Sequence, residues 1–331
     1  MFAQFKKHLH TQWRLWRSTP PFEPASMAIG VSHEATQIHA LQLRRGHDGA
    51  LTIQLHAHVS HLPLAATPWG LTEASLSALA PLLPTPTPSL VLALPSALVQ
   101  HQYRHLPAPD QTLDEQAYAA LAQEVAPDSV AMDYQCLDVA TPDSSPLYLL
   151  CYAHLDAVHH YQRVAQALQL HLSCLDVEPF AALNAWYFWL QRQAPTQMDQ
   201  VLLLIHARPT DLSVLFSQRQ RLIHHANTPL IDTPEHPEPV QARDFILQCW
   251  QSFHATHNAP VAHAYLTGRH SLNPNFRHAI AKSLSVPLIC AHPVTALAAS
   301  PPFTAQALNE HAPDLLITFG LALRALDGAP P

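Results

Sequence analysis

Glycine is scarce in this chain, at 7 of 331 residues. Loops that bind phosphate through backbone amides need glycine, because a side chain keeps the phosphate away from the turn. Neither a G-x-x-x-x-G-K-[S/T] loop nor a G-x-S-x-G motif occurs in the sequence. The sequence therefore does not support a P-loop nucleotidase or an α/β-hydrolase, and we expect no catalytic residue of either kind.

Charged residues are also few, at 12%, whereas apolar residues make up 48% of the chain. The apolar content is enough for a sizeable core, and the shortage of charge suggests that a partner covers part of the surface. The formal net charge of −7 gives no overall attraction to nucleic acid. We therefore expect no nucleic-acid partner.

The five cysteines are widely spaced and form no C-x-x-C pair, which favours free thiols in a reducing compartment. No apolar stretch reaches the roughly 18 residues of a membrane span. The N-terminus also lacks the apolar core of a signal peptide. These features predict a cytoplasmic chain whose membrane contact is peripheral or made through a partner.

Histidine is abundant, at 25 residues, but no H-E-x-x-H motif or compact Cys/His cluster occurs. The closest group is His56, His58 and His61. Apolar and polar residues alternate over residues 53–60, so His56 and His58 should lie on the polar face of a strand. We interpret that face as solvated and expect no metal site.

Residues 1–25 form a distinct basic segment, in which no acidic residue precedes Glu23. Its apolar residues follow helical spacing, so the segment could lie on an anionic membrane surface or pack against its own domain. The residues expected to contact a membrane are Phe2, Phe5, Lys6, Lys7, Leu9, Trp13 and Trp16.

The rest of the chain reads as two similar α/β halves. Each half opens with three closely spaced strands and continues with alternating helices and strands, which suggests two related lobes. The opening strands are expected at residues 28–31, 37–43 and 51–59 in the first half, and at 201–205, 212–216 and 221–225 in the second. A short final helix is expected over residues 319–326.

Five segments resemble those of the PilM family, the FtsA-like branch of the actin superfamily. In order, they are Val-Leu-Ala-Leu-Pro-Ser (91–96), Met-Asp-Tyr-Gln-Cys-Leu (132–137), Leu-Leu-Cys-Tyr-Ala (149–153), Leu-Asp-Val-Glu-Pro-Phe (175–180) and Phe-Gly-Leu-Ala-Leu-Arg (319–324). The resemblance spans residues 28–325. It implies a two-lobed actin-like α/β fold of the ribonuclease H-like type, with a subdomain inserted in the first lobe.

The resemblance also implies domain bounds. The first lobe should cover residues 26–198, with the insertion at about 97–170. The second lobe should cover residues 199–312, and residues 313–331 should form a helix that returns to the first lobe.

The nucleotide motifs of the family are altered in this chain. The acid and lysine of the first phosphate hairpin are replaced by Gly30 and Gln37, and the acid and glycine of the second by Leu204 and His206. Carboxylates at these positions would help to place magnesium, so we expect no ATP hydrolysis and disfavour binding of ATP and Mg²⁺. The residues left to line a nucleotide cleft are Ser32, His33, Thr210, Gly268 and Arg269.

The resemblance implies that the chain should be a scaffold of a type IV pilus or DNA-uptake platform, attached peripherally to the inner membrane. It should bind the cytoplasmic N-terminal peptide of a PilN-like membrane protein in a groove of the first lobe, and link it to the pilus motors. Two alternatives stay open. One is an active ATPase or kinase of the same fold, and the other is a GspL-like assembly protein of type II secretion.

The basic N-terminal segment gives a first prediction. If it binds anionic lipid, deleting the residues before Ser26 should lower the share of the chain recovered with membranes. The measurement is membrane fractionation in cells that lack the PilN-like protein. Unchanged recovery of the truncated chain would exclude the lipid-binding hypothesis.

Overall fold

The computed structural model describes residues 26–33, 37–60, 71–84, 89–106, 113–121, 126, 129–138, 145–231, 238–297 and 305–327. The membrane-contact residues predicted between Phe2 and Trp16 lie outside these ranges, as does His61. Within the described ranges, no helix is both long and apolar enough to cross a membrane.

The first lobe is built on a five-stranded sheet with the order β3-β2-β1-β4-β8. Its strands are β1 (Met27–His33), β2 (Gln37–Arg45), β3 (Leu51–Ser60), β4 (Ser89–Leu94) and β8 (Leu172–Val177). The first three pair antiparallel, whereas β1 with β4 and β4 with β8 pair parallel. The sheet is therefore mixed, with β3 at one edge.

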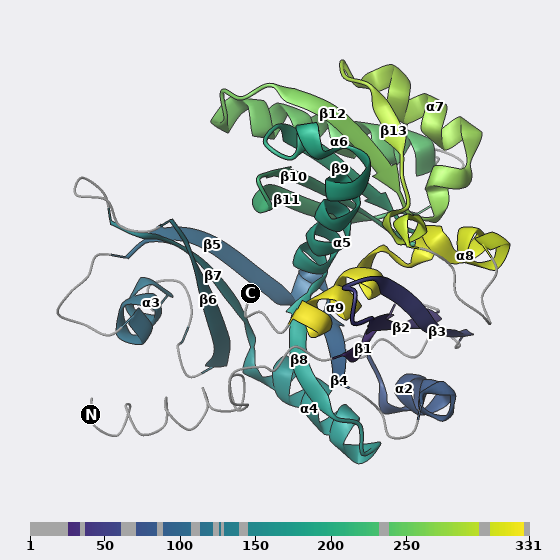
Figure 1. Cartoon of the computed structure of the whole chain (residues 1–331). Coiled ribbons are helices and arrows are strands. Elements are labelled where there is room, and N and C mark those ends of the chain that lie inside the picture. The colour runs from purple at the N-terminus through teal and green to yellow at the C-terminus, as the bar shows by residue number, and fades with distance from the viewer. Residues whose placement is uncertain are drawn as a thin grey trace.

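The second lobe repeats this plan in the sheet β11-β10-β9-β12-β13. Its strands are β9 (Val201–Ala207), β10 (Asp211–Gln218), β11 (Arg221–Pro229), β12 (Val261–Thr267) and β13 (Leu288–Cys290). As in the first sheet, β10 pairs antiparallel with both β9 and β11, whereas β12 pairs parallel with both β9 and β13. This repetition confirms the two related α/β lobes expected from the sequence (Figure 1).

Helices cover both faces of each sheet. On the first sheet, α2 (Glu73–Leu79) and α4 (Leu155–Ala167) cover one face, and α9 (Leu316–Asp327) covers the other. On the second sheet, α6 (Glu238–Thr256) and α7 (Pro274–Ser283) share a core with the outer face. The helix α5 (Glu178–Gln193) runs from the first sheet to the second and lies in a core that both lobes share.

Strands buried on both faces explain the long apolar runs in the sequence. In β2, Ile38 and Ala40 face the core that contains α2 and α4, whereas Leu41 and Leu43 face the core that contains α5 and α9. Successive side chains of a strand point to opposite faces, so a strand between two helical layers needs apolar residues on both.

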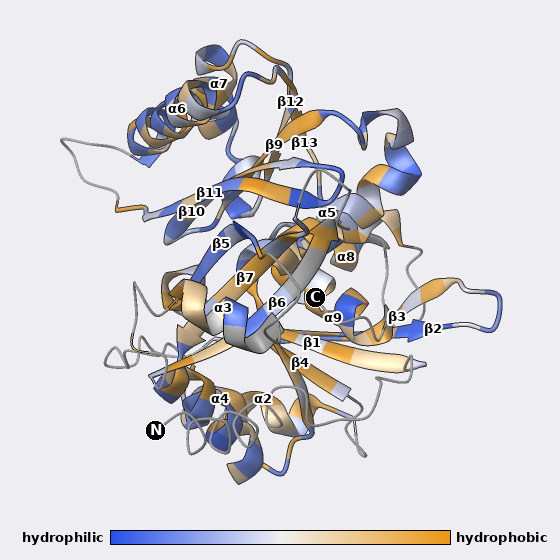
Figure 2. Ribbon diagram, turned by 90° about the vertical axis from the view of Figure 1, so that its left-hand side faces the viewer, coloured by the Kyte–Doolittle hydropathy of each residue, from blue (hydrophilic) through white to orange (hydrophobic). Residues whose placement is uncertain are grey.

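A three-stranded sheet is inserted between β4 and β8. It has the order β5-β7-β6, with β5 (Val99–His105), β6 (Val130–Asp138) and β7 (Leu147–His154), and packs with α3 (Leu113–Leu121) around a small core of its own. The Tyr103 hydroxyl of β5 donates a hydrogen bond to the Leu222 carbonyl of β11. The inserted sheet thus also contacts the second lobe, where Figure 2 shows β5 beside β11.

Two glycines allow α9 to pack closely. A Cβ atom at Gly320 would fall on the carbonyl group of Ala181 in α5, and one at Gly30 would collide with the backbone of Thr318 and Ala322 in α9. Farther along α9, Arg324 Nε lies 3.4 Å from Asp176 Oδ2, and the two side chains are 11% and 3% exposed. Gly30 and Gly320 therefore allow close contacts between backbones, and these contacts hold α9 in the first lobe.

Candidate functional site

The altered second phosphate hairpin is the turn between β9 and β10, and Arg208 in this turn forms two ion pairs. Arg208 Nη1 lies 2.9 Å from Glu178 Oε1, at the start of α5. Its Nε donates to Asp211 Oδ1 at 2.8 Å. The Arg208 and Glu178 side chains are only 10% and 8% exposed. The ion pair thus connects the β9–β10 turn of the second lobe to α5, which follows the last strand of the first sheet.

Ser96 also donates hydrogen bonds to Glu178. Its backbone N–H and its hydroxyl donate to Glu178 Oε2 at 3.2 and 3.3 Å. Ser96 begins η2 (Ser96–Leu98), directly after β4. Glu178 thus accepts hydrogen bonds from two segments of the chain, as a buried carboxylate must to offset its lost hydration.

The charges at this junction compensate one another. Burial by itself raises the pKa of Glu178, but the Arg208 charge, with lesser contributions from Arg208 hydrogen bonding, His33 and the Ser96 amide, outweighs it and holds that pKa below its usual value. Burial, followed by the Arg208 charge, lowers the pKa of His206 to about 3. With His206 uncharged and Arg208 matched by Glu178 and Asp211, little net positive charge remains to attract phosphate.

The predicted nucleotide residues fall into two groups. Thr210 and Gly268 lie at the β9–β10 turn, where Thr210 Oγ1 donates to Asp211 Oδ2 at 3.2 Å and a Cβ at Gly268 would collide with Ala207. His33 Nε2 lies 3.4 Å from the Tyr161 hydroxyl of α4, and His33 contributes to lowering the pKa of Glu178. The φ angle of +89° at Gly268 also favours glycine.

Ser32 and Arg269 form the second group, which contacts the C-terminal segment. The Ser32 and Thr318 hydroxyls lie 2.6 Å apart in the interior. Arg269 forms an ion pair with Asp314 of η7 (Ala312–Asp314). These side chains therefore interact with other parts of the same chain.

Gly30, which stands at the acid position of the first hairpin, has no room for a carboxylate. Its missing side chain makes space for α9, so an aspartate there would displace the Thr318 and Ala322 backbone. The packing of the C-terminal helix therefore leaves no space for an acidic side chain at this position.

The sequence did not predict the role of Arg208, and for Glu178 it left open a helix-start role and a role in the cleft. Glu178 does begin α5, where a carboxylate interacts favourably with the helix dipole. A signal for the ion pair existed in the sequence, because Arg208 directly follows the strongly apolar run that begins at Val201.

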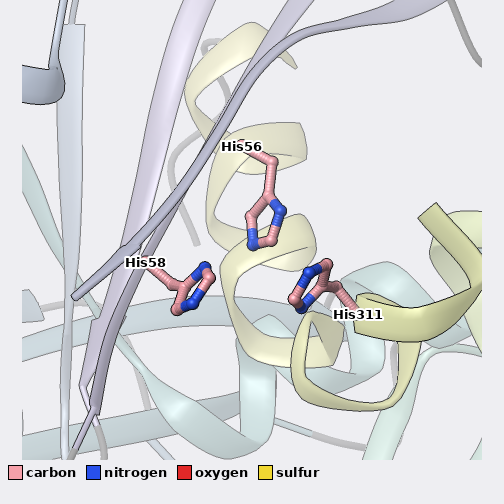
Figure 3. Close-up of side chains that lie close together, drawn as sticks. All are labelled: His56, His58 and His311. Carbon is pink, nitrogen blue, oxygen red and sulfur yellow. The ribbon is translucent and has the colours of Figure 1, made fainter. Parts of the chain in front are cut away.

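The polar face of β3 differs from the predicted solvated surface. His58 is exposed, but His56 is half-buried, and both approach His311 at the end of α8 (Ala305–His311). Their imidazole rings face one another in Figure 3. The prediction is wrong for His56 because α8, far away in the sequence, covers that part of the strand.

This architecture is the actin-like ATPase fold, and solved structures of other proteins share it. A chain of a PilM–PilN type IV pilus biogenesis complex matches with a TM-score of 0.79 and 19% identity, covering 93% of this chain and 100% of that one. The present chain therefore has a PilM-like actin fold, as its sequence segments suggested. No family model and no curated protein sequence matches the chain.

Other structures are less similar. A Bacteroides thetaiotaomicron protein of unknown function with an actin-like ATPase fold matches with a TM-score of 0.51 and 8% identity, covering 84% of this chain and 98% of that one. The cytoplasmic domain of EpsL, from the type II secretion system of Vibrio cholerae, matches with a TM-score of 0.45 and 9% identity, covering 87% of this chain and 94% of that one.

The junction gives a prediction about stability. Replacing Glu178→Gln should lower the free energy of unfolding at pH 7 by about 1.5–3 kcal/mol, the usual worth of hydrogen bonds to charged groups. A carboxylate with a lowered folded-state pKa stabilises the fold above its unfolded pKa, and this stability is lost as pH falls through the folded value. The deficit of the variant should therefore shrink as the pH falls below 4.5, the ordinary pKa of glutamate.

Urea unfolding of both proteins across this pH range makes the measurement. The control is Asp199→Asn, which removes the partner of Arg219 at 2.9 Å in an ion pair whose side chains are 79% and 70% exposed. Exposed pairs contribute little, so this variant should stay close to the wild type. Equal losses for the two variants, or a pH-independent deficit for Glu178→Gln, would contradict the assignment.

Proposed function

We propose that this chain is a scaffold of a type IV pilus or DNA-uptake platform that binds the cytoplasmic N-terminal peptide of a PilN-like membrane protein and does not hydrolyse ATP. The observation that carries this proposal is the match, over nearly the full length of both chains, to the PilM–PilN complex. That complex pairs PilM with PilN, which supports a PilN-like partner here.

The proposal that ATP is not hydrolysed rests on the junction between the lobes. An actin-type nucleotidase places magnesium with carboxylates and surrounds the phosphates with backbone amides. Here Gly30 cannot be replaced by an acid without moving α9, and Arg208 is paired with Glu178 and Asp211 in the second turn. The same contacts that hold the lobes together thus remove the features that phosphate binding needs.

The partner peptide would be captured by contacts with apolar surface, as extended peptides and amphipathic helices are in other proteins. The low charge of the chain suits such a partner. In this proposal the chain lies in the cytoplasm against the inner membrane. The PilN-like protein holds it there, the basic N-terminal segment adds a second contact with lipid, and the scaffold links both to pilus motor and platform components.

Two other functions are distinguished by experiment. An active ATPase or kinase would use the same fold, and it requires that Mg-ATP bind at the junction despite the Arg208 ion pair. A GspL-like assembly role in type II secretion requires a different membrane partner. Binding of a PilN-like peptide separates the proposed function from both.

Isothermal titration of the purified full chain with two ligands tests the proposal. The ligands are a synthetic N-terminal peptide of the PilN-like protein from the same genome, with a scrambled peptide as control, and Mg-ATP. We expect saturable binding of the authentic peptide alone, without heat from Mg-ATP. Magnesium-dependent ATP turnover that disappears in Thr210→Ala would overturn the proposal, as would equal binding of the authentic and scrambled peptides.

A further inference from the structure

Three histidines from two distant segments converge beside the edge strand of the first sheet. His56 and His58 lie two residues apart on β3, so their side chains share one face of the strand. His311 ends α8, which follows the second lobe in the chain. One ring nitrogen from each of the three lies within 4.8 Å of the others, and Figure 3 shows the rings turned toward a common space.

We propose that His56, His58 and His311 form a binding site for a divalent transition-metal ion, with zinc as the best fit, which fastens α8 to β3. This inference goes beyond the scaffold function and does not depend on it. The site differs from a magnesium site for nucleotide, because its donors are imidazole nitrogens, which suit zinc, nickel and copper, whereas magnesium prefers oxygen.

The distances require a modest adjustment on binding. A tetrahedral zinc ion with Zn–N bonds of about 2.0–2.1 Å holds two nitrogens about 3.4 Å apart. The ring centroids of His56 and His58 lie 4.8 and 5.1 Å from that of His311. Because His58 is exposed, its ring can turn inward without displacing packed side chains. Its exposure also leaves a route from solvent and a fourth coordination position for water.

The interior side of the site holds imidazole nitrogens whose hydrogen bonding is incomplete. Among the described residues, His56 Nε2 is buried without a hydrogen-bond partner, as is Nδ1 of the neighbouring His39. His39 lies directly opposite His58 on β2, and its Nε2 is 3.1 Å from Gln37 Oε1. Buried polar atoms normally have partners, and an ion bound through His56 Nε2 would supply one there.

The local charge permits a cation. A metal ion would bind each neutral imidazole through the lone pair of a ring nitrogen, so the ligands themselves would add no charge to the site. The positive charge of Arg269 lies near enough to repel a cation at His311, but Arg269 forms an ion pair with Asp314. Because Asp314 also acts on His311 in the opposite sense, the pair adds little net repulsion to the site.

A bound ion would have a structural consequence. The edge strand β3 belongs to the first lobe, whereas α8 leads into η7, whose Asp314 pairs with Arg269 from η5 (Arg269–Leu272) of the second lobe. Zinc would therefore fasten this connecting segment to the edge strand of the first sheet. It should stabilise the folded chain because it binds the native arrangement.

The experiment uses the full chain, stripped with a chelator, dialysed, and titrated with Zn²⁺ by calorimetry at neutral pH. The variants are His58→Ala and His311→Ala, and the matched control is His171→Ala, which removes an exposed histidine outside the cluster. Each cluster variant should bind zinc at least about 100-fold more weakly, because loss of even an outer partner of a metal ligand costs about 10- to 100-fold. His171→Ala should bind like the wild type.

Thermal unfolding provides a second readout. Zinc should raise the Tm of the wild type and of His171→Ala, but not that of His58→Ala or His311→Ala. The exposed His58→Ala decides the question if His311→Ala fails to fold. Absence of zinc binding by the wild type, or undiminished binding and Tm shift in His58→Ala, would overturn the proposal.

Discussion

The structure depends on a buried ion pair between its two lobes. Arg208 extends from the β9–β10 turn to Glu178, where the chain leaves the first sheet and enters α5. Both charges are buried, so each must be matched or the fold loses stability. Ser96 also donates to Glu178, and Asp211 also accepts from Arg208, so the pair fixes the end of β4, the start of α5 and the second-lobe turn relative to one another. The apolar core around α5 and α9 then closes over residues of both sheets.

In this arrangement, residues of the two candidate phosphate hairpins and of the nearby Gly268 turn make structural contacts. Gly30 makes room for α9, Gly268 makes room for the backbone of Ala207, and Arg208 forms an ion pair. Gly30 leaves no room for an acid, and Arg208 is already paired, so in the proposed function neither position serves phosphate or magnesium. A scaffold needs a fixed relation between its lobes, whereas an actin-type nucleotidase needs space between them, so these substitutions are consistent with the proposed function.

Much of the fold could be predicted from the sequence, because apolar runs and their repetition specify two lobes of mixed sheet and helix. The segments 175–180 and 319–324, noted for their resemblance, meet in space through Asp176 and Arg324. The polar strand β5 gave no periodic signal because its side chains are largely half-exposed and it is held by pairing with β7. Arg208 stood out because it follows an apolar run, but its pairing with Glu178 could not be predicted, and neither could the His56–His58–His311 cluster. Each joins residues that only the tertiary fold brings together.

Hydrogen–deuterium exchange tests the central claim, that the β9–β10 turn serves as a contact between the lobes and does not bind nucleotide. We expect saturating Mg-ATP to leave amide exchange unchanged over residues 204–211 and 267–271. Under the same conditions a PilN-like peptide should slow exchange within the first lobe. Slower exchange across the β9–β10 turn with Mg-ATP would show that nucleotide binds there despite the ion pair, and it would contradict the claim.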